Sequence, residues 1–257
     1  MGLTKKLRTN KSKFGESTTL IHGQYGCGKT LLSAQYPKPY FLMFENNNDY
    51  QNILHHDNIT SWNQCAEIVQ ELLDGGHDFK TIVFDNIDRF CDIACQHYIK
   101  EYNAANPKKK INSLLDIGYG KAHETVENMI KIVLNPLVMD NRFGIIFISH
   151  TETRSIETFS GDTYDKLCPE IGFKRMRKYF FSEPANIFYY YFHDKVRYLK
   201  IVGDDTVMAK HRGIGHFMTK KGEAVINIPM KNSPQEAFKY LKGAYNNQLT
   251  NTYSHIK

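Results

Sequence analysis

The stretch TTLIHGQYGCGKT, residues 18–30, decides the fold of this 257-residue chain. Its first five residues are mostly β-prone and contain the apolar pair Leu20 and Ile21, and they predict a buried strand over residues 18–22. The next eight match the phosphate-binding pattern G-x-x-x-x-G-K-[ST] in full. Residues 29–35 then favour a short helix, which Pro37 ends. A strand, a glycine-rich loop and a helix in this order predict a phosphate-binding loop.

Each residue type in this loop suits a nucleoside triphosphate. Glycines let successive backbone N–H groups point inward without side-chain clashes, and the start of a helix adds a positive dipole end. Lys29 is expected to reach the β- and γ-phosphates, and the Thr30 hydroxyl to bind Mg²⁺. The predicted nucleotide-binding residues are Gly23, Gln24, Tyr25, Gly26, Cys27, Gly28, Lys29 and Thr30.

Composition and charge narrow the class of protein. Apolar residues make up 41% and charged residues 23%, as in ordinary globular proteins. No stretch approaches the roughly 20 consecutive apolar residues that span a bilayer. The five cysteines are odd in number and scattered, as expected of reduced thiols. We therefore expect a cytoplasmic protein without a membrane partner. The net charge of +6 permits nucleic-acid binding but does not require it.

Short apolar runs alternate with segments of helical periodicity, which predicts an α/β fold with a mostly parallel sheet flanked by helices. Further strands are expected over residues 40–45, 81–84, 143–149, 187–192, 196–202 and 206–211. Helices are expected over residues 61–75, 90–102, 126–141 (closed by Pro136 and Asn141), from 173 onward, and 233–245. Residues 151–163 are interpreted as a polar loop.

The same pattern suggests how the chain is organised. We expect a basic, flexible N-terminal tail over residues 1–15 and a single core domain over residues 16–230. A C-terminal helix and tail would follow over residues 231–257, as a small extension beside a hairpin.

Asp85 is the candidate magnesium residue. It ends the apolar strand TIVFD, residues 81–85, and the carboxyl end of a parallel strand faces the same crevice as the phosphate loop. There it would bind a Mg²⁺ water or Thr30. The alternative is that Asp85 caps the following helix, a position that Asp also favours.

The residue after Asp85 is Asn86, whose amide cannot accept a proton as a general base. Two carboxylates remain as candidates, Glu45 and Asp88. Glu45 is better placed, because it ends a neighbouring buried strand where a side chain points into the crevice. The alternative for Glu45 is a solvated acid at a strand end.

These segments together resemble the RecA-like ATPases, and more closely the small phage ATPases of that group, which act in single-strand annealing or recombination. The resemblance covers about residues 16–215. It implies a RecA-like P-loop core that hydrolyses ATP with Mg²⁺, and it implies that Glu45, ending FLMFE, is the catalytic glutamate. His150, which ends IIFISH at residues 145–150, would detect the γ-phosphate. The segment DIGYGK, residues 116–121, also looks like the phage group.

The segment KHRG, residues 210–213, looks like the Lys-x-Arg element of the RadA and DnaB-type branch. There two cations reach the nucleotide of the neighbouring subunit and stabilise charge on the transferred phosphoryl group. Lys210 and Arg212 would play this part here, which implies a homo-oligomer, as a ring or a filament. The alternative is an exposed basic strand end.

The resemblance also implies single-stranded DNA on loops that face the oligomer axis. Lysine and arginine contacts to phosphates would make such binding salt-dependent and largely independent of sequence. The alternatives are a solvated loop for the lysine run and a core role for the aromatics of FKRMRKYFF, residues 173–181. The candidate nucleic-acid residues are Lys108, Lys109, Lys110, Arg154, Lys174 and Arg175.

Two hypotheses of function follow. The first is a DNA-stimulated ATPase that acts on single-stranded DNA in phage recombination, annealing or replication. A single-strand-binding protein, a helicase or a nuclease would be its partner. The second is a nucleotide-regulated binding module that ATP switches for such a partner, with little turnover. Asn86 in place of a carboxylate motivates the second hypothesis.

Overall fold

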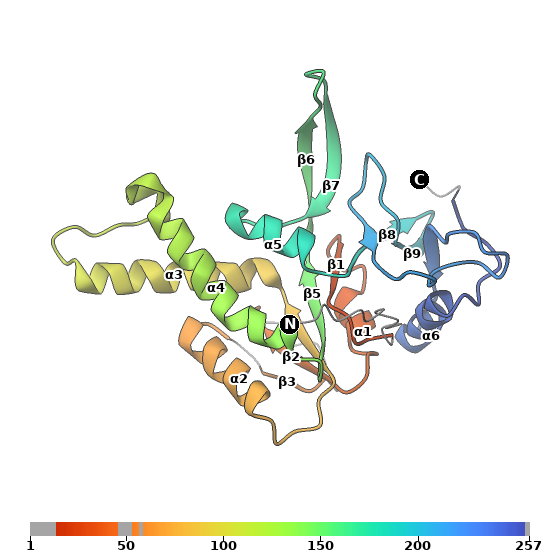
Figure 1. Ribbon diagram of the computed structural model, residues 1–257, viewed down its shortest axis with the longest axis horizontal. Helices are drawn as coiled ribbons and strands as arrows, with labels where there is room; N and C mark the ends of the chain where they lie inside the picture. The colour runs from red at the N-terminus through yellow and green to blue at the C-terminus, as the bar shows by residue number, and fades with distance from the viewer. Residues whose placement is uncertain (1–13, 46–52, 57–58, 255–257) are drawn as a thin grey trace, which may run out of the picture.

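The computed structural model describes residues 14–45, 53–56 and 59–254. A central sheet is covered by helices on both faces (Figure 1). Residues 1–13 of the expected N-terminal tail and residues 255–257 of the expected C-terminal tail lie outside the described residues. The strands of the sheet are β1 (Thr19–Gly23), β2 (Pro39–Met43), β3 (His55–His56), β4 (Thr81–Asp85), β5 (Gly144–Ser149), β8 (Asn186–His193), β9 (Val196–Lys200), β10 (Lys210–His211) and β11 (Asn227–Met230).

The strand order is β11-β9-β8-β1-β5-β4-β2-β3, with β10 paired to β8. Every pair from β8 to β3 is parallel, while β9, β10 and β11 add antiparallel strands. Parallel strands are buried on both faces, which explains the unbroken apolar runs in β4 and β5. The expected α/β fold with a mostly parallel sheet is confirmed. The predicted hairpin is not a separate extension, because β8 pairs directly with β1.

Two hydrophobic clusters hold the helices on the sheet. One face carries α2 (Trp62–Asp74), α3 (Ile87–Ala105), α4 (Lys121–Met139) and α5 (Arg177–Ser182). The other carries α1 (Lys29–Ser33) and α6 (Pro234–Tyr245). Three short 3-10 turns complete the helical structure of the described residues, η1 (Leu114–Asp116), η2 (Gly118–Gly120) and η3 (Lys174–Met176). Ala237, Leu241 and Ala244 of α6 share a buried cluster with Ile21 of β1.

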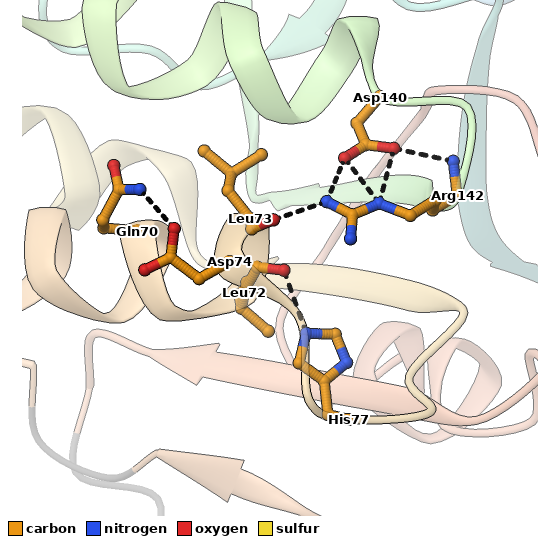
Figure 2. A network of polar contacts seen from close by, with 7 residues as sticks. All are labelled: Gln70, Leu72, Leu73, Asp74, His77, Asp140 and Arg142. Carbon is orange, nitrogen blue, oxygen red and sulfur yellow. Dashed lines mark hydrogen bonds and ion pairs between the residues drawn. The ribbon is translucent and has the colours of Figure 1, made fainter.

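Helix α2 has a well-defined start and end. The Ser61 hydroxyl accepts the Gln64 N–H at 3.3 Å, and Gly75 follows the last turn. At the other end the Arg142 guanidinium donates to the Leu73 carbonyl at 2.6 Å, and the His77 ring donates to the Leu72 carbonyl at 3.0 Å (Figure 2). Arg142 also binds Asp140. The network therefore joins the end of α2 to the turn that leads into β5.

The helix expected over residues 126–141, closed by Pro136 and Asn141, begins at Lys121 and continues through Pro136 to Met139. A proline inside a helix removes one N–H donor, which leaves the carbonyl four residues earlier without its partner. That carbonyl belongs to Ile132, whose side chain is 72% exposed, so water can take the donor's place. Pro136, one of the two residues expected to close the helix, therefore does not end it, because the lost hydrogen bond falls on the exposed side of the helix.

The polar loop expected over residues 151–163 is instead part of a hairpin. It contains β6 (Thr151–Glu157) and reaches β7 (Thr163–Pro169), an antiparallel pair that projects from the body of the protein (Figure 1). Exposure alternates along β6, as a two-residue period requires. Neither face of the pair is strongly apolar, so the sequence lacks the usual strand signal.

The strands in the C-terminal part of the chain differ from the prediction at two places. Within the expected strand over residues 206–211, only Lys210–His211 forms a strand of the sheet, while Val207 makes an isolated bridge with Leu167. Conversely, β11 was not predicted, because it contains Pro229. Proline is tolerated there since β11 pairs with β9 alone and lies at the edge of the sheet.

His22 is a buried polar residue within β1. Its Nε2 donates to the Met208 carbonyl at 2.8 Å, so its Nδ1, 2.9 Å away, accepts from the Thr151 hydroxyl when the ring is neutral. Burial lowers the pKa of His22 to about 3. The neutral ring therefore ties β1 to the first residue of β6 and to the segment before β10.

We expect Phe147→Ala to lower the free energy of unfolding by about 3–5 kcal/mol, measured by urea denaturation. Phe147 is fully buried between the rings of Phe84 and Phe180, with centroids 5.4 and 5.1 Å away. Phe159→Ala is the matched control, because Phe159 is fully exposed and its removal should change stability by no more than about 0.5 kcal/mol. Equal losses in the two variants would contradict this packing.

His22 predicts an acid-sensitive fold. The unfolded ring titrates near 6.5 and the folded ring near 3, so between these values the unfolded state binds the extra proton. Stability should therefore fall as the pH drops below about 6.5, with His22 contributing up to about 1.4 kcal/mol per pH unit. His22→Gln should flatten the slope in denaturation series between pH 7 and 4. His193→Gln, at a partly exposed ring, should leave the slope unchanged. Identical slopes in all three proteins would exclude this role for His22.

Candidate functional site

The loop over residues 23–30 lies where the carboxyl ends of the parallel strands meet. Two of its glycines are required by the backbone. A Cβ on Gly23 would lie 2.1 Å from the Tyr190 carbonyl oxygen, because β8 runs directly beside it. Gly28 has φ = 101°, in the left-handed region that side chains disfavour. Close strand packing at one end and a reversed backbone at the other thus fix the shape of the loop.

Helix α1, which follows the loop, is only five residues long. The sequence predicted that a helix dipole would add to phosphate binding, but a single turn contributes little of that field. The backbone N–H groups of the loop itself are therefore the main electropositive feature next to Lys29.

Lys29 and Thr30 are both buried and reach different partners. The Lys29 ammonium donates to the carbonyls of Gly23 and Gln24, each at 2.8 Å. The Thr30 hydroxyl donates to a carboxylate oxygen of Asp85 at 2.6 Å. Phosphate oxygens are stronger acceptors than neutral carbonyls, so they would compete well for the ammonium protons.

Asp85 is buried at the end of β4, and burial raises its pKa to about 6. Burial likewise lowers the pKa of Lys29. A divalent cation would offset the cost of holding the Asp85 charge, and hard oxygen ligands from Asp85 and Thr30 are those that Mg²⁺ prefers. These two residues therefore fit a magnesium ion.

The cap of α3 is Asn86, so the alternative of a capping role for Asp85 is wrong. The Asn86 side-chain oxygen accepts the Arg89 N–H at 3.0 Å. Its amide nitrogen donates to Glu45 at 3.0 Å, and the Arg89 guanidinium lies 3.5 Å from the same Glu45 oxygen. Asn86 thus caps α3 and positions Glu45, two roles that the sequence reasoning missed. The position of Asn86, directly before an amphipathic helix, was the sequence signal for a helix cap.

One cleft of about 260 Å³ gathers most of the predicted nucleotide site. Its lining comes from the loop, from Glu45 after β2, from Asp85 in β4, and from the end of β5. Asp88 is not among the lining residues, because its carboxylate accepts the Gly172 N–H at 2.6 Å. The residues that line the cleft are Tyr25, Gly26, Gly28, Lys29, Thr30, Leu31, Glu45, Asp85, Ile148 and His150.

His150 lies over the loop, and its ring stacks on Tyr25 with centroids 3.7 Å apart. Burial, and then the nearby Lys29 charge, lower the pKa of His150. Its buried Nδ1 has no hydrogen-bond partner within the described part of the chain. A neutral imidazole facing the cleft can donate or accept one hydrogen bond, depending on its tautomer.

Lys210 and Arg212 do not line this cleft within a single chain. The Lys210 ammonium donates to the Phe181 carbonyl at 2.6 Å, and Arg212 donates to the Ser182 carbonyl. Both cations therefore bind the carboxyl end of α5, where their charge also complements the helix end.

The candidate nucleic-acid residues lie in separate parts of the structure, and some of them are exposed while others contact neighbouring side chains. Lys108, Lys109 and Lys110 are exposed in the loop after α3, which lies at the left of Figure 1, away from the tip of the β6–β7 hairpin at the top. On β6, the Arg154 guanidinium lies 5.8 Å from the Phe181 ring centroid and its Nε 3.9 Å from Glu152.

The segment FKRMRKYFF supplies a basic exposed face and an apolar buried one. Lys174 is exposed in η3, and Arg175 forms an ion pair with Glu127 at 3.2 Å. Phe173, Tyr179 and Phe180 are buried, so the core role left open for these aromatics is the correct one. Elsewhere in the described residues, no helix is long and apolar enough to cross a membrane.

Residues 16–212 match the AAA_24 family, described as an AAA domain. None of the curated proteins compared with the chain matches it. Among solved structures, the chain is similar to the KaiC-like protein PH0186 from Pyrococcus horikoshii OT3, with 12% identity, coverage of 86% of this chain and 88% of that one, and a TM-score of 0.44. It is also similar to the RadB recombinase, with 9% identity, coverage of 86% and 90%, and a TM-score of 0.44. Because the family match spans most of the chain and includes the whole phosphate loop, this chain belongs to the AAA_24 family of P-loop ATPase domains.

Proposed function

We propose that this chain hydrolyses ATP and that single-stranded DNA stimulates the reaction, in phage recombination, annealing or replication. The observation that supports hydrolysis is the convergence of Lys29, Thr30, Asp85, Glu45 and His150 on one cleft. Each comes from a different strand end or from the loop, so the parallel sheet alone brings them together.

The roles in hydrolysis follow from where each side chain lies. Lys29 binds the β- and γ-phosphates in place of the loop carbonyls, and His150 hydrogen-bonds the γ-phosphate through its ring. Thr30 and Asp85 would hold Mg²⁺, which would supply positive charge to neutralise the phosphates. Glu45 orients a water and accepts its proton as the water oxygen bonds to the γ-phosphorus. The bond to the β-phosphate oxygen breaks, which yields ADP and phosphate.

The β6–β7 hairpin is the proposed link between ATP and DNA. β6 begins at Thr151, directly after His150, and Thr151 also contacts His22 of β1. The hairpin projects from the body of the protein and carries Phe159, fully exposed, in the turn between its strands (Figure 1). An exposed ring can stack on a nucleobase, while basic side chains bind the phosphates. A change at His150 would thus reach this surface through adjacent residues.

Lys210 and Arg212 support an oligomer in which each site is completed by a neighbouring subunit. Their present partners are neutral carbonyls at the end of α5. Hydrogen bonds to phosphate are stronger than those to carbonyls, so a neighbour's nucleotide would compete for both cations. The proposed assembly is a ring or a filament of identical subunits.

A second candidate function, a nucleotide-regulated switch with little turnover, is favoured by the surroundings of Glu45. Its carboxylate is engaged by the Asn86 amide at 3.0 Å and by the Arg89 guanidinium at 3.5 Å. Both donors meet the same carboxylate oxygen, so a catalytic water would have to displace one of them or use the other oxygen. In this function, ATP would change the shape of the protein for a partner without being consumed quickly.

Glu45→Gln should separate the two functions. If Glu45 is the base, steady-state ATP hydrolysis should fall by about 10²–10⁴-fold, while ATP affinity measured by calorimetry stays within about threefold. Asp88→Asn is the matched control and should retain turnover, because Asp88 lies outside the cleft. A switch protein would hydrolyse slowly and be insensitive to both substitutions. DNA dependence is tested by adding single-stranded oligonucleotide at two salt concentrations. The absence of both stimulated hydrolysis and filter binding would refute DNA dependence.

Mixing of inactive variants should reveal a site shared between subunits. Lys29→Ala disables the loop and Arg212→Ala the cation, so each variant alone should be inactive. In an equimolar mixture, about a quarter of the interfaces would pair an intact loop with an intact neighbouring Arg212, and hydrolysis should return to that extent. Arg212→Ala mixed with the Lys29→Ala, Arg212→Ala double variant should stay inactive. No recovery in the first mixture would contradict the shared site.

A further inference from the structure

A second hollow adjoins the phosphate cleft on the other side of the loop. Gly28 and Leu31 line both spaces, so the two adjoin each other at the start of α1. Its polar and aromatic walls include Tyr190 of β8, Arg197 of β9 and Lys231 after β11, and the rest of the lining is Leu32, Asn232, Pro234 and Ala237. Sequence reasoning assigned a role to neither Arg197 nor Lys231.

Register explains why these residues meet there. Tyr190 pairs with Gly23 of β1, which places its ring beside the loop, and Phe192 pairs with Arg197 across β8 and β9. A Cβ built on Gly28 would lie 3.8 Å from the Tyr190 ring and 4.0 Å from the Arg197 Nε. Arg197 therefore reaches the phosphate loop from a strand more than 160 residues away in sequence.

Arg197 is held in place yet retains an unused donor. Its guanidinium lies over the Phe192 ring, 5.0 Å from the ring centroid. Its Nε is buried and has no hydrogen-bond partner among residues 14–45, 53–56 and 59–254. A buried donor without a partner is unfavourable, and a ligand acceptor at this position would satisfy it.

The charge of the hollow also selects its ligand. Two cations, Arg197 and Lys231, line it, and no carboxylate is among its described lining residues. A planar guanidinium stacks well on flat, electron-rich rings and donates to ring nitrogens and carbonyl oxygens. The hollow measures about 40 Å³, so it admits the edge of a heterocycle, with the rest of the ring lying across its mouth.

We propose that this hollow binds the nucleoside half of the substrate, with Arg197 as the residue that contacts the purine base and Tyr190 and Lys231 completing the walls. The inference rests on the proposed ATPase function, because the triphosphate in the cleft fixes where the nucleoside extends. With the β- and γ-phosphates at Lys29, the ribose and base run over Gly28 and Leu31 into the hollow. Arg197 thereby distinguishes a nucleotide from a bare polyphosphate.

The test compares ATP with inorganic tripolyphosphate, each titrated calorimetrically with Mg²⁺ into the full chain. Arg197→Ala should weaken ATP binding about tenfold or more and leave tripolyphosphate binding within about twofold. Arg197→Lys keeps the charge but loses the planar group, so it should also weaken ATP binding. Lys195→Ala, an exposed cation of the same β8–β9 hairpin, is the matched control and should change neither affinity.

Each outcome decides between the claims. Unchanged ATP affinity in Arg197→Ala, or equal losses for both ligands, would overturn the assignment of Arg197 while leaving the phosphate site intact. Circular dichroism and thermal melting of each variant establish that an affinity loss is not unfolding. A wild-type chain that binds neither ligand would instead refute the proposed ATPase function, and the nucleoside site with it.

Discussion

The buried hydrogen bond from the Thr30 hydroxyl to Asp85 connects the phosphate loop to β4, which lies two strands away from β1 in the sheet. Thr30 follows β1 and Asp85 ends β4, and β5 lies between those two strands. A contact across an intervening strand forms only where all three strands end at the same level. The bond therefore depends on the parallel register of the sheet, and the remaining site residues depend on that register too.

Two opposite charges are buried close to each other at this edge. Burial disfavours the charged form of both Lys29 and Asp85, and it shifts their pKa values toward neutrality. A triphosphate with a divalent cation supplies the missing counter-charges, a negative one for Lys29 and a positive one for Asp85. The fold thus holds an unfavourable arrangement in place, and the nucleotide and metal relieve it. Asn86 and Arg89 hold the Glu45 carboxylate at the same edge of the sheet through a hydrogen bond and an ion pair.

The sequence was informative where one continuous segment carries the signal. The loop over residues 23–30, the end of β4 at Asp85 and the position of Glu45 all follow from local pattern plus the rule that parallel strands end together. It was not informative where a residue acts through distant partners. His22 contacts residues 129 and 186 positions away, and Arg197 meets the loop only through the pairing of β8 with β1. The β6–β7 hairpin was missed because its strands lack an apolar face.

The central claim is that the loop over residues 23–30 binds a triphosphate with its magnesium. The most direct measurement is a crystal structure of the full chain with Mg²⁺ and a non-hydrolysable ATP analogue. We expect the Lys29 ammonium to have exchanged the Gly23 and Gln24 carbonyls for β- and γ-phosphate oxygens, with the metal beside Thr30 and Asp85. An analogue bound elsewhere, or a Lys29 that still donates to those carbonyls while the analogue is present, would contradict the claim.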